Sequence, residues 1–464
     1  MKSGSDDKAD SALPSVKRAR LPPPPASSAL QQLLGTSTTT AEFFATHWEQ
    51  APLIFHSSLQ RNRPALPSWD NLLNVFHVAD KSLHSSILHL KDQIPTTTYA
   101  SPAAAYLDGA SLIVNHAEAA SSGVAALCHE LRETFPHAFG NLYVTPPAGR
   151  AVDAHADDRD VFVLQLEGRK EWKVYGPPPV AFPAPDEQVG KHGLSVPAAS
   201  VDPARALVDA ALEVGDVMYI PRGFVHEAAT SPDAPSLHLT LALPSHDWSW
   251  ASLAGSAATA GRLPSHGRDG PALSRVLRAR EHCHVDGEDE MPWMAWMWRR
   301  SVPPPLAMDI GSDACVAYGK RVLAAVGAEL GPDAAPLLLA LLRERSAVHA
   351  SRQDEASREG ARWREELAGV GVGPLSFVRR RRDDEPDSRS VRADDTDEGS
   401  GGGGGLMARE EFADALFATL ARLTTTPCRV TTFDDGPLLD DFGKACFASV
   451  CVDLGLLVVE SRKF

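Results

Sequence analysis

A histidine and an aspartate stand two positions apart, at His155 and Asp157, in the segment NLYVTPPAGRAVDAHADDRDVFVLQLEGRK of residues 141–170. Residues i and i+2 of an extended segment point the same way, so one short piece of backbone can present both side chains to one metal ion. A second histidine, His226, follows in YIPRGFVHEA. Two histidines and one carboxylate are the ligand set of non-haem Fe(II) oxygenases. A polar loop is the alternative, because a His-x-Asp pair also arises by chance in a chain with 17 histidines.

Short strand-like runs surround these candidate ligands. They are residues 141–146, 160–166, 170–175, 214–220, the segment that starts at His226, and 237–243. The last of these runs alternates in polarity, as a half-buried strand does. Glu167-Gly168-Arg169 is typical of a hairpin turn between two of them. Short strands and turns with metal-type ligands at the strand ends predict a jelly-roll or cupin barrel.

Taken together, these motifs resemble the ribosomal oxygenase branch of the JmjC-type 2-oxoglutarate oxygenases. That family is described as ribosomal-protein histidyl hydroxylases and, in some reports, histone lysine demethylases. The resemblance covers about residues 40–243, and the order and spacing of its motifs agree as well as their residue types. The motifs are FFATHWEQAPL (43–53), NLYVTP (141–146), HAD (155–157), GRKEW (168–172), GD (215–216), YIPRG (219–223) with His226, and SLHLT (236–240).

The resemblance implies that His155, Asp157 and His226 bind iron. It also implies that Lys170 binds the far carboxylate of 2-oxoglutarate, for which a compact ammonium on a long stem is suited. The alternative for Lys170 is a surface lysine of the hairpin, a description that we expect to fit its neighbour Arg169.

Three more residues match family positions at or near the co-substrate. Asn141 and Tyr143 share one face of a strand, and Thr240 lies on the last strand of the barrel. His238 shares the face of Thr240, but it also fits the description of a core histidine with satisfied hydrogen bonds.

The activity that the resemblance implies is that of an Fe(II)-dependent protein oxygenase with 2-oxoglutarate and O2 as co-substrates. It would convert 2-oxoglutarate to succinate and CO2 and hydroxylate a histidine side chain of a ribosomal protein. The same chemistry on an N-methyl group would make the protein a histone N-methyl-lysine demethylase. A non-catalytic chromatin or ribosome-assembly scaffold is the third alternative, and an intact ligand set argues against it.

Resemblance and composition together divide the chain into four parts of an α+β protein. Residues 1–36 form a disordered tail, and residues 37–245 form the double-stranded β-helix (jelly-roll, JmjC) oxygenase domain. The resemblance implies that residues 246–350 form a helical dimerisation domain, so a homodimer is expected. Residues 351–464 form a winged-helix-like domain with a flexible acidic, Gly-rich insertion near 379–405.

The formal net charge of −15 bears on the partners of the chain. Phosphate contacts require Lys and Arg, so direct sequence-specific binding of nucleic acid is not expected. A basic protein substrate, either a ribosomal protein or a histone, is favoured. The alternative is that the charge serves solubility alone. No apolar run approaches the length of a membrane span.

The compartment is predicted from short signals. The six cysteines include no CxxC pair, which favours a reduced intracellular compartment. Residues 17–20, KRAR, resemble a nuclear address, so we expect the nucleus, including the nucleolus, with the cytoplasm as the alternative. His282-Cys283-His284 lacks a second ligand pair at zinc spacing, and we interpret it as a loop.

Apolar periodicity predicts the remaining elements around the barrel. Ahead of it we expect helices at 40–49, 68–78 and 123–135 and strands at 86–90 and 111–115. Cys128 lies on the apolar stripe of the third helix, and we predict a core residue there. After the barrel we expect helices at 248–262, 271–280, 315–330, 334–346, 412–423 and 440–454, and a strand at 456–460.

Two further segments after the barrel have a distinctive composition. The charged composition of residues 351–364 predicts a solvated helix there. Residues 291–300, MPWMAWMWRR, fit either a helix core or a subunit contact, because Trp, Met and Arg are enriched at interfaces.

Overall fold

The computed structural model describes residues 28–56, 66–97, 99–150, 152–263, 298–304, 323–324, 326–328, 330–368, 377–380, 428–430, 440–454 and 456–461. The first part of this structure is built on one large antiparallel sheet. Its strands are β1 (Leu53–Phe55), β2 (Ser86–Lys91), β3 (Ile94–Thr96), β4 (Ser111–Asn115), β5 (Phe139–Thr145), β6 (Asp160–Gly168), β9 (Val217–Ile220) and β11 (Ser236–Leu243). Their order across the sheet is β1-β9-β6-β11-β5-β4-β2-β3.

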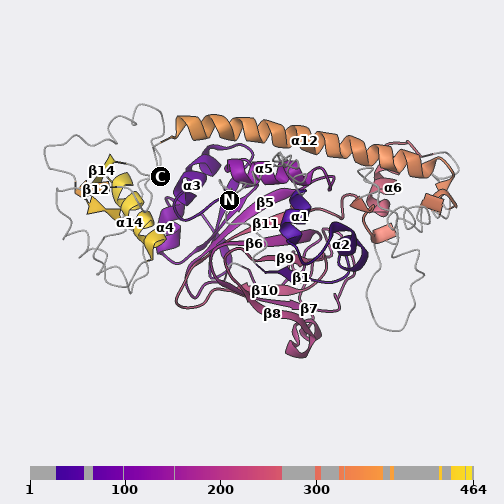
Figure 1. Ribbon diagram of the computed structural model, residues 1–464, viewed down its shortest axis with the longest axis horizontal. Helices are drawn as coiled ribbons and strands as arrows, with labels where there is room; N and C mark the ends of the chain where they lie inside the picture. The colour runs from indigo at the N-terminus through magenta and orange to yellow at the C-terminus, as the bar shows by residue number, and fades with distance from the viewer. Residues whose placement is uncertain are drawn as a thin grey trace, which may run out of the picture.

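A second, smaller sheet closes the barrel. Its strands are β7 (Lys170–Tyr175), β8 (Ala206–Leu212) and β10 (His226–Ala229), in the order β10-β7-β8. Figure 1 shows it below the large sheet, on the side away from most of the helices. The strands of the two sheets agree with the sequence-based expectation with four exceptions. Strands β1, β3 and β8 were not predicted, and β9 begins later than expected because Gly215 (φ 95°) belongs to a turn.

The two faces of the large sheet carry different kinds of side chain. Leu237, Leu239 and Leu241 of β11 are buried in the main hydrophobic core on the helix side. Because side chains alternate along a strand, the intervening His238 and Thr240 point toward the small sheet. His238 pairs in register with Tyr143 of β5, which therefore has the same orientation. The alternation thus brings polar side chains into the interior of the barrel.

Five short helices precede or interrupt the sheet strands. They are α1 (Ala29–Leu34), α2 (Thr40–Thr46), α3 (Leu72–Lys81), α4 (Pro102–Leu107) and α5 (Ser122–Leu131). Helix α2 starts as expected, with the side chain of Thr39 accepting a hydrogen bond from Glu42 N at 3.2 Å. Cys128 of α5 is buried in the core, as predicted. The expected tail ends sooner than predicted, because Leu30, Leu33 and Leu34 of α1 are fully buried.

One long helix, α12 (Ala334–Glu366), packs against the helices α3, α5 and α6. It runs along the top of Figure 1, over α3 and α5, and reaches α6 (Trp250–Thr259). We expected two helices, and the single continuous helix contradicts this prediction. The second helix was expected in solvent, and residues 351–364 are exposed on one face but buried on another. The helix crosses residue 350, where we placed a domain boundary. Its second half is bound to the barrel domain, since the buried Glu359 accepts hydrogen bonds from Ser82 Oγ at 2.9 Å and Leu83 N at 3.2 Å.

The C-terminal part has its own three-stranded sheet. Strands β12 (Phe377–Arg380), β13 (Cys428–Arg429) and β14 (Leu457–Ser461) are ordered β13-β12-β14, and helix α14 (Asp441–Asp453) accompanies them. The last helix and strand agree with the prediction. Strand β12 contradicts one part of the prediction. Its final two residues, 379 and 380, fall in the segment that we expected to be a flexible insertion. Phe442 of α14 packs on Tyr106 of α4, with ring centroids 4.9 Å apart.

Several predictions fall on residues outside the described ranges. They concern the helices at 271–280 and 412–423, most of 315–330, the loop 282–284, and residues 291–297 of the Trp/Met cluster. Within the described part, no helix has both the length and the apolar character that crossing a membrane requires.

Candidate metal centre

The three predicted metal ligands come from two segments that are paired through the backbone. His155 and Asp157 lie on the loop before β6, and His226 is the first residue of β10. His155 N donates to His226 O at 3.1 Å, and His226 N donates to His155 O at 2.9 Å. Gly223 N, in the turn before β10, donates to Asp157 O at 2.8 Å. These bonds hold the loop and the strand in a fixed relation.

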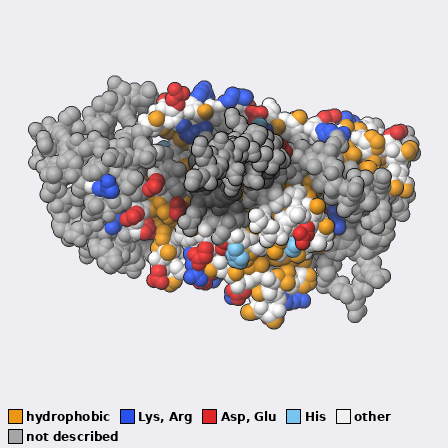
Figure 2. Space-filling view, in the orientation of Figure 1, with side chains coloured by type: hydrophobic (Ala, Val, Ile, Leu, Met, Phe, Trp, Pro, Cys, Tyr) orange, Lys and Arg blue, Asp and Glu red, His pale blue; other side chains and the backbone are white. Residues whose placement is uncertain are grey.

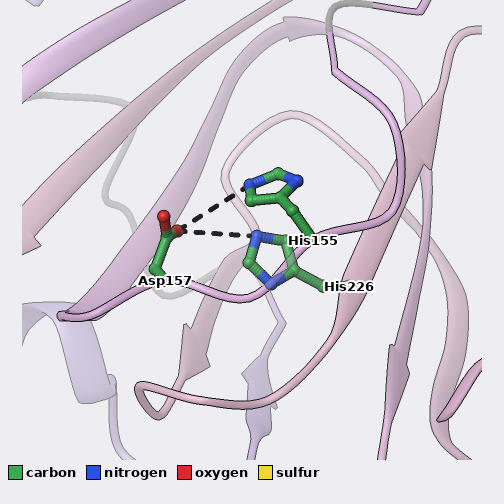
Figure 3. Close-up of side chains that lie close together, drawn as sticks. All are labelled: His155, Asp157 and His226. Atoms are coloured by element: carbon green, nitrogen blue, oxygen red, sulfur yellow. Dashed lines mark ion pairs between the residues drawn. The ribbon is translucent and has the colours of Figure 1, made fainter. Parts of the chain in front are cut away.

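The side chains of the three residues converge on one point, as Figure 3 shows. Each offers a ligand atom, and these atoms lie within 4.8 Å of one another. Asp157 Oδ2 is 3.7 Å from His226 Nε2 and 4.0 Å from His155 Nε2. The sequence prediction that these residues come together is therefore confirmed in its geometry. Among the described residues, no other group of three such side chains converges in this way.

The protonation of the two rings suits a metal. His155 Nδ1 lies 2.7 Å from Asp153 O, and His226 Nδ1 lies 3.0 Å from Phe224 O. A carbonyl oxygen only accepts hydrogen bonds, so each Nδ1 holds the proton and each Nε2 presents a lone pair. Burial, together with the nearby His226 and Lys191, lowers the pKa of His155 to about 3, so the ring is neutral at pH 7.

Asp157 supplies the negative charge of the centre. Its burial acts to raise the pKa of the carboxyl, but nearby cationic groups, Lys191 first among them, lower that pKa below its ordinary range. Lys191 Nζ forms an ion pair with Asp157 Oδ1. The carboxylate is therefore ionised at neutral pH, as a metal ligand must be. Sequence analysis missed Lys191, since it lies in a long connection without periodicity.

A pocket opens beside the ligand atoms. It is lined by the triad and by Tyr143, Lys170, Trp172, His238 and Thr240, together with Val152, Val161, Val163, Glu227 and Ala228. The predicted co-substrate residues Tyr143, Lys170 and Thr240 are thus on the wall of the same pocket. Asn141 is not part of that lining, and its Oδ1 accepts a hydrogen bond from His116 N at 3.1 Å.

Lys170 is a buried cation without an acidic partner among the described residues. Its side chain is 2% exposed, and its Nζ donates to Thr145 Oγ1 at 2.9 Å. Burial lowers the pKa of its ammonium to about 7. The neighbouring Arg169 is half exposed and pairs with Glu213 at 3.2 Å, so it is the surface residue of the hairpin. A buried amine facing a pocket fits a ligand that brings its own carboxylate.

His238 belongs to the pocket wall, although sequence analysis left a core position open. Its ring stacks on Tyr143 with centroids 4.7 Å apart and meets the edge of Trp172 at 5.4 Å. Burial holds the pKa of His238 well below its usual value, and the nearby Lys170 lowers it further. A neutral aromatic wall therefore lies next to Lys170 and Thr240. The shared strand face of His238 and Thr240 was the available signal.

One protein-family model matches the part of the chain that contains the site. This model, described as the JmjC domain, matches residues 115–250, a range that contains all three candidate ligands and the strands β5 to β11. This stretch of the chain is therefore similar to the JmjC domain, and the structure gives it a large antiparallel sheet and a two-histidine, one-carboxylate cluster.

Named relatives narrow the resemblance to ribosomal oxygenases. Ribosomal oxygenase 1 of Gallus gallus is 35% identical over 219 residues, which are 43% of this chain and 34% of that protein. The bifunctional lysine-specific demethylase and histidyl-hydroxylase NO66 of Drosophila mojavensis is 32% identical over 222 residues, or 44% of this chain and 24% of that protein. The chain thus spans about a third or less of these relatives. The structure of the Escherichia coli ribosomal oxygenase YcfD with cobalt and 2-oxoglutarate aligns with 92% of this chain and 99% of that chain, at 15% identity and a TM-score of 0.34.

Proposed function

We propose that this protein is an Fe(II)- and 2-oxoglutarate-dependent oxygenase that hydroxylates a histidine side chain of a ribosomal protein. One observation carries the proposal. The convergent His155, Asp157 and His226 share a pocket with Lys170, a buried cation for which the described residues offer no acidic partner. A metal and a small dicarboxylate would complete this pocket chemically.

The donor set fits iron. Two neutral imidazoles with free Nε2 lone pairs and one carboxylate are the ligands that non-haem Fe(II) sites use. When bound, iron and 2-oxoglutarate would supply the oxidation that places one oxygen atom of O2 on an unactivated carbon, with succinate and CO2 as co-products.

The residues around the triad would bind and orient the co-substrate. Lys170 would form an ion pair with its far carboxylate, and the hydroxyl groups of Tyr143 and Thr240 face the same space. Trp172 and the nearby valines would keep water away, which strengthens these electrostatic contacts. Asn141 would support the pocket indirectly, since its side chain hydrogen-bonds Tyr143, which lines the pocket.

The substrate class rests on two further observations. The similar proteins carry the names ribosomal oxygenase and histidyl-hydroxylase. The net charge of −15 favours a basic polypeptide as partner, and ribosomal proteins are of that kind. On the face drawn in Figure 2, acidic and basic side chains are intermingled. A preference that rests on net charge would weaken as salt screens it.

Histone N-methyl-lysine demethylation is the second candidate, because one similar protein is named a lysine-specific demethylase and the same metal site would serve. Mass spectrometry of ribosomal-protein and methylated histone peptides, incubated with the protein, Fe(II) and 2-oxoglutarate, separates the two. Hydroxylation adds one oxygen to a histidine peptide, whereas demethylation removes a methylene and releases formaldehyde. Formaldehyde release without oxygen addition to any histidine peptide would overturn our choice. A scaffold role would yield no succinate at all.

We also propose the finer organisation expected from the sequence. The boundary expected at residue 350 would move to the end of α12, so residues 246–366 would form a helical dimerisation domain. Residues 367–464 would form a winged-helix-like domain that contacts protein rather than a specific nucleic-acid sequence. The basic cluster at residues 17–20 would direct the protein to the nucleus, including the nucleolus. Microscopy of a fluorescent fusion with these four residues intact or replaced by alanine tests the location, and an unchanged distribution would exclude this signal.

A further inference from the structure

The long connection between β7 and η1 (Ala198–Val201), residues 176–197, lies against the loop that carries His155 and Asp157. We call this connection the strap. Ala156 N donates to Val189 O of the strap at 2.9 Å. A Cβ atom added to Gly190 would lie 2.8 Å from His155 Cα, and Gly190 has a φ of +78° that only glycine adopts readily. The strap backbone and the ligand loop are therefore in direct contact.

The strap also supports the turn that leads to the third candidate ligand. A Cβ atom on Gly223 would lie 2.6 Å from Val180 O, and Gly223 N donates to Asp157 O at 2.8 Å. Val189 and Val225 share a small hydrophobic cluster with Ala156. The strap thus packs against both segments that hold the triad.

One ion pair anchors the strap to a distant part of the chain. Glu187, two positions before Val189, binds Arg299 through both carboxylate oxygens, with Oε2 to Nη1 at 2.8 Å and Oε1 to Nη2 at 3.0 Å. Arg299 Nη1 also donates to Phe182 O at 3.4 Å. The Arg299 side chain is 3% exposed and that of Glu187 is 20% exposed, so the pair is largely shielded from solvent. Two-pronged, shielded pairs of this kind fix geometry well.

Arg299 is itself held in place from the other side. Its carbonyl accepts a hydrogen bond from Arg222 Nη2, and Arg222 pairs with the buried Glu49 at 3.1 Å. Two residues on, Ser301 N donates to Glu49 Oε1 at 3.0 Å. Arg299 therefore has a rigid base in the barrel domain, while its guanidinium reaches the strap.

We propose that Arg299, acting through Glu187, is a positioning residue for the metal-ligand loop. The strap has no sheet or helix of its own between 176 and 197, so its position depends on its contacts with other segments. Among these are the ion pair of Lys191 with Asp157 and the anchor at Glu187. The pair keeps His155 and Asp157 at the separation that a metal needs. This inference rests on the metal centre of the proposed function, and it is independent of which substrate that centre serves.

Co(II) alone is the probe for the test, added to the full-length protein without 2-oxoglutarate or peptide. Its absorption spectrum reports ligand geometry, and titration gives its dissociation constant. We expect Glu187→Gln and Arg299→Gln each to weaken Co(II) binding about tenfold, the lower end of what supporting residues contribute. The double variant should lose no more than either single one, because both changes break the same pair. The Co(II) spectrum should shift in all three.

The matched control is the pair Arg262–Glu344, which is also two-pronged, at 2.7 and 3.1 Å, but lies on the surface between the end of α6 and α12. Arg262→Gln should leave the Co(II) affinity and spectrum as in the parent. If Arg299→Gln fails to fold, the partly exposed Glu187→Gln carries the test by itself.

Parental affinity and spectrum in a folded Glu187→Gln variant would overturn the inference, as would additive losses in the double variant. A parent that binds no Co(II) would overturn the metal centre as well. A parent that binds Co(II) normally but oxidises no ribosomal peptide would contradict the proposed substrate alone.

Discussion

The carbonyl groups of Asp153 and Phe224 decide the chemistry of the triad, because they fix which nitrogen of His155 and His226 is free for a metal. We expect His155→Ala or Asp157→Ala to abolish metal binding and turnover, since each removes a direct ligand, while the fold remains. Co(II) titration and succinate formation measure the effect. Asp153→Ala is the control, because Asp153 contributes its backbone carbonyl, which the variant keeps. Near-normal turnover of His155→Ala would rule out the assignment.

Lys170 should act on 2-oxoglutarate rather than on the metal. In the Lys170→Ala variant, the co-substrate loses its buried cationic partner, a change that costs roughly 3–5 kcal/mol where one member of a buried pair is removed. The KM for 2-oxoglutarate should rise steeply while Co(II) affinity is maintained. Arg169→Ala removes the exposed neighbour and should change neither value. An unchanged KM in Lys170→Ala would place Lys170 outside the co-substrate site.

The lowered pKa of Lys170, about 7, makes co-substrate binding depend on pH. Below pH 7 the amine already holds its proton, and above pH 7 it must take one up to pair with a carboxylate. Affinity for 2-oxoglutarate should therefore fall by about tenfold for each pH unit above 7. Calorimetry in buffers of different ionisation enthalpy should show proton uptake near pH 8. Lys170→Arg keeps its charge throughout and should bind without that uptake; the same uptake in this variant would assign the proton to another group.

For single residues, the family resemblance placed Asn141, Tyr143 and Thr240 at or near the co-substrate. Tyr143 and Thr240 line the pocket, whereas Asn141 does not. Lys191 and Glu187 could not be found from periodicity, because the strap has no repeating pattern. The partner of Glu187, Arg299, is far away in sequence, and only the folded chain brings the two together.

At the scale of an element, the composition of residues 334–366 did not predict the length of helix α12 or the burial of its second half. Its apolar first half and charged second half suggested two helices, but residues 347–350, AVHA, contain no helix-breaking residue between them. The second half was expected in solvent because it is rich in charged residues. Tertiary contacts override that expectation, since Gln353, Ala356, Glu359 and Gly360 are buried against the barrel domain.

At Gly360, helix α12 lies directly against the backbone of the barrel domain. A Cβ atom at this position would press on the carbonyl of Ala119, with its carbonyl carbon 3.0 Å away. Gly360→Ala should therefore destabilise the protein by about 1–3 kcal/mol, as overpacking does, even though alanine favours helix. Chemical denaturation measures the change. Gly327→Ala is the control, because the nearest atom to its Cβ would be 3.8 Å away, and it should be neutral or stabilise by up to about 1 kcal/mol. A stabilised Gly360→Ala variant would contradict the close contact.

For the whole molecule, the main prediction is assembly into a dimer through the helices of residues 246–350. Three tryptophans and three methionines lie within residues 291–300, a composition typical of subunit contacts. Trp298 is already 3% exposed within one chain, so it belongs to the core, and the contact would fall to other members of the cluster. Closed two-fold dimers are the commonest assemblies of identical chains.

Light scattering of the purified protein at micromolar concentration should give twice the chain mass of 49.7 kDa. Trp296→Arg should give the monomer mass with the circular dichroism of the parent, because a charge in an apolar contact between subunits opposes association. Trp298→Ala is the contrasting variant, and it should lower stability by about 3–5 kcal/mol through the cavity it leaves. A monomer mass for the parent would exclude the dimer. A dimer that persists in Trp296→Arg would move the contact away from this part of the cluster.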